Sequence, residues 1–71
     1  MNENERIKKD ILLFKQNIQK LSGKNKQLKP AELAMQYHQD AQFYLEKKDY
    51  FTAFGCINYA HGLLDAVTFL A

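Results

Sequence analysis

The last third of the chain is apolar on nearly every side of a predicted helix, and this limits how the chain can fold. From Tyr50 onward, residues spaced four and three apart form one apolar stripe: Ala53, Ile57, Ala60, Leu64, Val67 and Ala71. Further apolar residues lie on the two flanks: Phe51, Phe54 and Phe69 on one, and Tyr59, Leu63, Ala66 and Leu70 on the other. A helix that is apolar all round must be covered by neighbours. The sequence therefore predicts a helix over residues 50–70 that needs partners on most of its surface.

A first helix is predicted over residues 3–22. Its apolar positions repeat in a 4-3-4-3 spacing, typical of a coiled coil or bundle helix, and are Ile7, Ile11, Phe14, Ile18 and Leu21. Leu12 and Leu13 are expected to widen this stripe. Ser22 and Gly23 are expected to end the helix, because glycine accepts the left-handed conformation of a C-terminal cap. The following KNKQLK is expected to be a polar connector with Leu28 as its apolar anchor.

A second helix is predicted over residues 30–47. Pro30 suits the first turn of a helix. The residues expected to face the core are Leu33, Ala34, Tyr37, Ala41, Tyr44 and Leu45. The sequence EKKDY indicates a tight turn in which Asp49 caps the third helix. We therefore predict a single all-α domain over residues 1–71, a three-helix bundle (up-down-up) whose second and third helices form a tight hairpin.

The third helix also predicts self-association. A chain of 71 residues buries only about 60% of its unfolded surface, and two partner helices hardly cover a helix that is apolar all round. Gly55 and Gly62 each cost up to roughly 1 kcal/mol against alanine inside a helix, and close approach of another helix backbone would compensate. We expect a homodimer. The dimer or packing candidates are Gly55, Gly62, Phe51, Phe54, Leu63, Phe69 and Leu70.

Cysteine usage and hydropathy indicate the compartment. Cys56 is the single cysteine, so an internal disulfide is impossible, and we expect a small buried side chain in a reduced cytoplasm. The opening MNENERIKKD is charged, so no signal peptide is expected. No apolar run approaches the roughly 20 residues of a membrane span, and no membrane association is expected.

The net charge of +2 is unevenly distributed. Residues 1–29 hold eight Lys and Arg against three acids, whereas residues 30–71 hold two Lys against five acids. A basic first helix could bind RNA through Lys8, Lys9, Lys15 and Lys20. The one aromatic residue among these lysines, Phe14, belongs to the apolar stripe, so the lysines are not interleaved with free aromatic residues as single-strand binding favours. A solvated helix face is the preferred interpretation, and a nucleic-acid partner is not expected.

Three polar side chains interrupt the apolar helix. Asn58, His61 and Asp65 share one face, where the Asp65 carboxylate can accept a hydrogen bond from the His61 imidazole. In the expected hairpin Asp40 comes near Ile57 and Asn58. The ligand-binding candidates are therefore Asn58, His61, Asp65, Asp40 and Tyr44. The preferred interpretation is a hydrogen-bonded network that sets helix register, and the alternative is a ligand site.

The signatures of catalysis and metal binding are missing from the sequence. There is no glycine-rich phosphate loop, no Ser/His/Asp arrangement and no cysteine pair, and Arg6 is the only arginine. His61 and Asp65 give two metal ligands, to which His38 or Asp40 could add a third. His38 by itself is expected to be an exposed or half-buried polar residue. We predict neither a catalytic residue nor a metal or other cofactor.

The stretch AQFYLEKKDYFTAFGCINYAHGLLDA resembles the archaeal family known as domain of unknown function 357. The matching elements are Tyr44–Lys47, Asp49–Tyr50, Ala53, Gly55–Ile57 and Tyr59–Ala66, with Lys48 where the family tends to glycine. The resemblance implies a small helical bundle in an archaeal cytoplasm and no established activity. We expect a non-catalytic, self-associating interaction module with an unknown protein partner. The alternatives are a small-molecule or nucleotide-binding bundle and, more weakly, an RNA-binding one.

Overall fold

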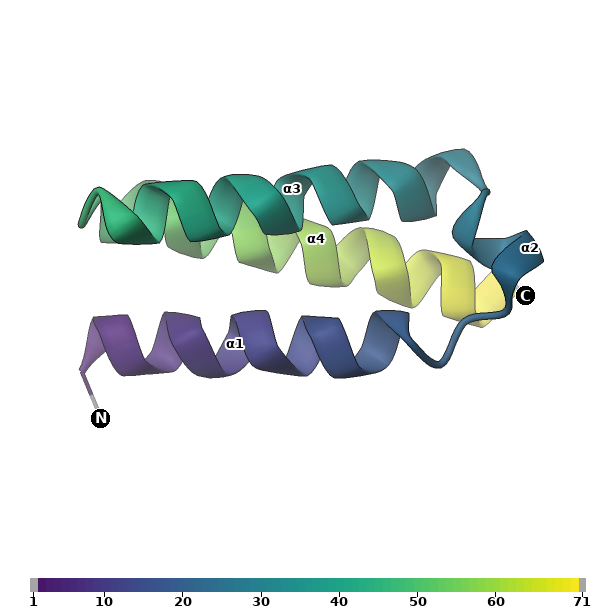
Figure 1. The fold of residues 1–71 in the computed structure, drawn as a ribbon, viewed down its shortest axis with the longest axis horizontal. Helices are drawn as coiled ribbons and strands as arrows, with labels where there is room; N and C mark the ends of the chain where they lie inside the picture. Colours follow the sequence, from purple (N-terminus) through teal and green to yellow (C-terminus); the bar gives the residue numbers. More distant parts are fainter. Residues whose placement is uncertain (1, 71) are drawn as a thin grey trace.

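The computed structural model describes residues 2–70 and contains four helices. These are α1 (Glu3–Ile18), α2 (Gly23–Lys26), α3 (Lys29–Glu46) and α4 (Tyr50–Leu70). The chain passes along α1, returns along α3 and passes again along α4, with the single turn of α2 at one end (Figure 1). No strand occurs within residues 2–70. The all-helical fold class is confirmed, and the short α2 makes the count four helices where three were expected.

The link between α1 and α3 differs from the prediction. Helix α1 ends at Ile18, and the Oγ of Ser22 accepts a hydrogen bond from the Asn25 amide at 3.1 Å. Gly23 is the first residue of α2 and does not have a positive φ. The prediction that Ser22 and Gly23 end the first helix was therefore wrong, because a serine hydroxyl favours the start of a helix. KNKQLK is accordingly partly helical, and Leu28 is exposed.

Helix α1 contributes one narrow apolar stripe to the core. Asn2 caps it by accepting a hydrogen bond from the Glu5 amide at 2.9 Å. Its buried residues are Ile7, Ile11 and Phe14, with Ile18 and Leu21 partly buried beside them. Leu12 and Leu13 are exposed, so the prediction that they widen the stripe was wrong. A helix turns by about 100° per residue, which carries both leucines away from the seam.

Helices α3 and α4 form the most extensive contact in the molecule. Alanines lie along it at full burial: Ala31, Ala34, Ala41, Ala53 and Ala60. Side chains this small let two helix backbones approach closely. The rings of Tyr37 and Tyr59 lie 4.6 Å apart between centroids, which confirms the predicted hairpin register. Tyr44, expected in the core, is instead exposed.

The turn between α3 and α4 closes on Lys48. The amide of Lys48 donates to the carbonyl of Leu45 at 3.0 Å, and the amide of Asp49 donates to that of Tyr44 at 2.9 Å. These two bonds define a Schellman cap, whose central residue takes the left-handed conformation. Lys48 has a φ of 62° in the position that usually holds glycine. The Oδ1 of Asp49 then accepts a hydrogen bond from the Thr52 amide at 3.2 Å, so the predicted cap of α4 is confirmed.

The buried side of α4 follows the predicted stripe. Ala53, Ile57, Ala60, Leu64 and Val67 are all buried. Ala71, the last predicted member, lies outside the described residues. The opposite side of α4 is largely exposed and carries the features described next.

Candidate functional site

The side of α4 that points away from the bundle is a continuous apolar surface, which we call the outer α4 face. Its central line consists of Phe51, Gly55, Asn58, Gly62, Ala66 and Phe69, all exposed. Its flanks are Phe54 and Asp65 on the side toward α1, and Tyr59 and Leu70 on the side toward α3. Asp65 is the only charged residue of α4. The surface is therefore apolar and nearly uncharged along its whole length.

The large side chains of this face are exposed to an unusual degree. Phe51 is 91% exposed, Phe69 89% and Leu70 82%. Tyr59 at 55% and Phe54 at 42% add to them. Single exposed apolar residues are ordinary, but a contiguous patch of this kind marks an interaction surface.

The two glycines of α4 belong to this outer surface and do not line a contact within the chain. A Cβ atom built on Gly55 or Gly62 would meet no other atom within 4 Å. The close helix approach expected at these glycines is therefore not made by α1 or α3. Between α3 and α4, the buried alanines allow the close approach instead. The two glycines leave a shallow, open strip in the middle of the outer α4 face.

The five ligand-binding candidates differ in their exposure. Asn58, Asp65 and Tyr44 are exposed, whereas His61 and Asp40 are half-buried. The Nε2 of His61 lies 2.8 Å from the backbone carbonyl oxygen of Asp10 on α1. The described structure contains no hydrogen bond between the side chains of His61 and Asp65, so the expected bond between them is not formed. His61 instead joins α4 to α1.

A cluster around Phe14, which the sequence did not reveal, joins all three long helices. The imidazole of His38 stacks on the Phe14 ring at 4.7 Å and 20°, and His61 meets the same ring edge-on at 5.7 Å and 83°. The Nε2 of His38 is buried without a hydrogen-bond partner among the described residues. In the sequence, His38 lies four residues after Ala34 and three before Ala41, on the same stripe of α3. This spacing could have indicated that His38 is partly buried.

The environment of His38 favours the neutral imidazole. Burial lowers the pKa of His38 below its ordinary value of 6.5, because a charged ring would lose its hydration. The Ile11 backbone on α1 opposes this lowering of the pKa, while the positive charges of Lys15 and His61 add to it. The cluster is therefore held together best when His38 is uncharged.

Neither a metal centre nor a reactive thiol is assembled in the described part of the chain. Within residues 2–70 no three His, Cys, Asp or Glu side chains are placed to hold a metal ion. Burial raises the pKa of the Cys56 thiol, and the negative charges of Asp40 and Asp49 raise it further. Cys56 is half-buried and remains a thiol at neutral pH, the inert form of cysteine.

Two clefts lie at the two ends of the outer α4 face. The first, of about 220 Å³, is lined by Glu3, Arg6, Ile7, Tyr50, Phe51 and Phe54. The second, of about 180 Å³, is lined by Asn25, Leu28, Pro30, Ala66, Val67 and Leu70. None of the five ligand-binding candidates lines either cleft. The sequence did not reveal that Arg6 of α1 lies beside the first aromatic residues of α4.

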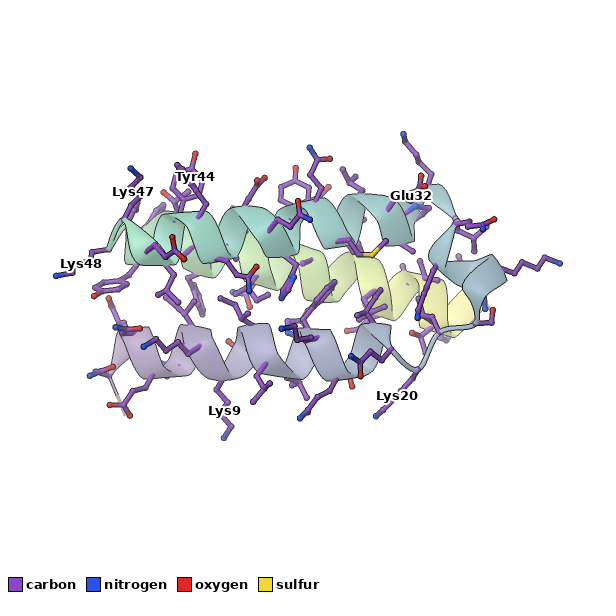
Figure 2. All side chains as sticks on the ribbon, in the orientation of Figure 1. Lys9, Lys20, Glu32, Tyr44, Lys47 and Lys48 are labelled. Carbon is purple, nitrogen blue, oxygen red and sulfur yellow. The ribbon has the colours of Figure 1, made fainter. Side chains whose placement is uncertain are left out.

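The lysines of the basic first helix lie on its outer side. Lys8, Lys9, Lys15 and Lys20 are all exposed. Lys9 and Lys20 point away from the other helices (Figure 2). On α3, Tyr44 lies beside Phe43, whose ring also faces the ammonium group of Lys47 at 5.3 Å. No helix among residues 2–70 has the combination of length and apolar content that a membrane crossing requires.

The fold and this surface define the class of the protein: a small all-helical domain with one apolar helix face exposed. The family model described as "Protein of unknown function (DUF357)" matches residues 9–71. The chain therefore belongs to this family, and the resemblance noted in the sequence is confirmed. No curated protein matches the chain.

Proposed function

We propose that this protein is a non-catalytic interaction module that associates with itself through the outer α4 face. The observation that carries the proposal is the exposure of Phe51, Phe69 and Leu70 along one nearly uncharged helix side. A cytoplasmic location, with Cys56 kept reduced, belongs to the same proposal.

The exposed area is of the right size for a stable contact. Given the area of aromatic and leucine side chains, the five large residues of the outer α4 face expose roughly 600 Å². A standard protein–protein interface takes about 800 Å² from each partner. With its glycines and the adjoining clefts, the outer α4 face supplies an area close to this.

The alternative functions have less support. Asn58 and Asp65 point outward from α4, and the Nε2 of His61 is occupied by the Asp10 carbonyl, so the three groups do not enclose a ligand. The RNA alternative depends on lysines whose one aromatic neighbour on α1, Phe14, is buried and not free to stack on a base. Both are therefore secondary to self-association.

The test is the mass in solution, measured by light scattering at tens of micromolar. The unmodified protein should have twice the mass of one chain, and the double variant Phe51→Ser/Phe69→Ser should have the mass of one. Leu12→Ser is the matched control, because Leu12 is an exposed apolar residue on α1, away from the outer α4 face. It should remain dimeric. A monomeric mass for the unmodified protein would overturn the proposal.

A further inference from the structure

We infer that the outer α4 face binds the same face of a second copy with the two α4 helices antiparallel, crossing at the level of Ala60. This inference rests on the proposed self-association and adds the geometry of the contact. A two-fold interface requires a surface that is complementary to itself. The pattern of large and small residues along α4 has that property in the antiparallel direction.

The ends of the central line, Phe51 and Phe69, are equally far from Ala60, and between them larger residues fall opposite smaller ones. In the antiparallel pair each residue lies opposite the one equally far beyond residue 60. Asn58 then lies opposite the partner's Gly62, and Phe54 lies opposite the partner's Ala66. The small residues in the middle let the two backbones approach, which compensates for glycine inside a helix. Both glycines leave open space for this approach.

The ends of the face then pair aromatic residues with one another. Phe51 lies opposite the partner's Phe69, and both side chains are about nine-tenths exposed in the single chain. The cleft beside Phe51 has a volume of about 220 Å³. An apolar cavity of roughly 150 Å³ holds a benzene molecule, so this cleft has room for a phenyl ring. The partner's Phe69 is the ring that the antiparallel arrangement brings there.

Charge favours the antiparallel direction over the parallel one. Phe54, His61 and Asp65 are spaced seven and four residues apart, and His61 contacts α1, so Asp65 lies on the side of α4 nearest α1. In an antiparallel pair related by a two-fold axis, the side of α4 nearest α1 lies next to the corresponding side of α4 in the other copy. The partner's Asp65 then comes to the level of Gly55, close to Arg6.

The position of Arg6 is known from the cleft that it lines with Tyr50 and Phe54. In a parallel pair, Asp65 of either copy would lie more than ten residues along α4 from the level of Arg6. This corresponds to a distance of roughly 15 Å or more. Only the antiparallel pair therefore brings Arg6 and Asp65 of different copies together.

Disulfide trapping distinguishes the two directions. In a Cys56→Ala background, Gly55→Cys and Ala66→Cys chains are prepared separately, then mixed and oxidised. Both substitutions are small and leave the aromatic residues, Arg6 and Asp65 intact. The antiparallel pair predicts a covalent dimer that contains one chain of each variant, and little or no covalent dimer from Ala66→Cys alone. Efficient self-linking of Ala66→Cys would show a parallel pair and overturn the inference.

Charge reversal at Arg6 and Asp65 tests the antiparallel direction independently and requires no new cysteine. Arg6→Asp and Asp65→Arg should each weaken dimerisation on the order of tenfold, because each creates like charges at two symmetric places. The double variant Arg6→Asp/Asp65→Arg should recover most of the affinity. Failure of the double variant to recover, with both single variants weakened, would overturn the inference.

The two proposals can fail separately. A dimeric mass for the unmodified protein together with Ala66→Cys self-linking contradicts the antiparallel geometry and leaves self-association standing. A monomeric mass for the unmodified protein contradicts both.

Discussion

Lys48 has the left-handed backbone conformation that the turn between α3 and α4 requires. Lys48 has a positive φ, 62°, at the centre of the Schellman cap between α3 and α4. Left-handed backbone brings the Cβ of an ordinary residue too close to the following carbonyl oxygen. The tight register of the hairpin below it, set by the alanines and by the Tyr37–Tyr59 contact, keeps Lys48 in this conformation.

Lys48→Gly should stabilise the protein by about 1 kcal/mol, since glycine adopts the left-handed region without steric cost. Urea unfolding followed by circular dichroism measures this change. Lys47→Gly is the matched control, because Lys47 has a right-handed φ of −77°, where glycine brings no relief of backbone strain. Glycine there adds chain entropy to the unfolded state and removes the contact of the Lys47 ammonium group with the Phe43 ring. The control should lose stability. A loss of stability in Lys48→Gly would show that the turn does not depend on this backbone conformation.

At the scale of a single element, α4 combines two opposite roles on its two sides. Ala53, Ile57, Ala60, Leu64 and Val67 are buried within the chain. The outer α4 face has no such cover, and its glycines lower the intrinsic stability of the helix. A helix optimised only for folding as a single chain would have alanine at both glycine positions.

Gly62→Ala should therefore have opposite effects on folding and on association. In the Phe51→Ser/Phe69→Ser background it should raise the free energy of unfolding by up to about 1 kcal/mol, because the new methyl group meets no other atom within 4 Å. With the aromatic residues intact, it should weaken the dimer in sedimentation equilibrium, because the added methyl group separates the two helices.

Ala66→Gly serves as the control on the same face. Ala66→Gly should lower the free energy of unfolding by about as much as Gly62→Ala raises it. If Gly62→Ala strengthened both folding and dimerisation, the glycines would have no role in close approach between copies.

At the scale of the whole molecule, the cluster around Phe14 connects the three long helices. Phe14 comes from α1, His38 from α3 and His61 from α4, and His61 also reaches the Asp10 carbonyl oxygen. Helix α1 makes fewer contacts with the rest of the molecule than α3 and α4 make with each other. This cluster is therefore a principal attachment of α1 to the hairpin.

The stability of the molecule should decrease in mild acid because of His38. Its pKa is lowered in the folded state, so the unfolded chain binds a proton at a higher pH than the folded chain does. The stabilisation is complete above the ordinary pKa of 6.5 and is lost progressively as the pH falls from there toward the folded-state pKa. Melting temperatures measured between about pH 7.5 and about pH 5 should fall accordingly.

His38→Gln removes this titration and is the variant to compare. Its melting temperature should depend less steeply on pH than that of the unmodified protein, whatever its absolute stability. Equal slopes for the two proteins would show that protonation of His38 does not control the attachment of α1.

The periodicity of the sequence was enough to predict the three long helices, the buried stripe of α4, the hairpin register and the Asp49 cap. These features depend on residues close together in the chain, through helical spacing and capping. Helix ends without such a strong signal were less predictable: Ser22 and Gly23 were assigned to the end of one helix, and they begin another.

Contacts between residues far apart in the sequence were decided only by the tertiary structure. The spacing of His61 and Asp65 allowed a hydrogen bond, but the partner of His61 is the carbonyl oxygen of Asp10, 51 residues away. Likewise, the glycines of α4 were predicted to lie against another helix backbone, and the structure shows that no helix of the same chain lies there. Helical spacing determines which residues share a side of a helix. Which side meets a neighbour, and which remains free for another chain, depends on how the helices pack.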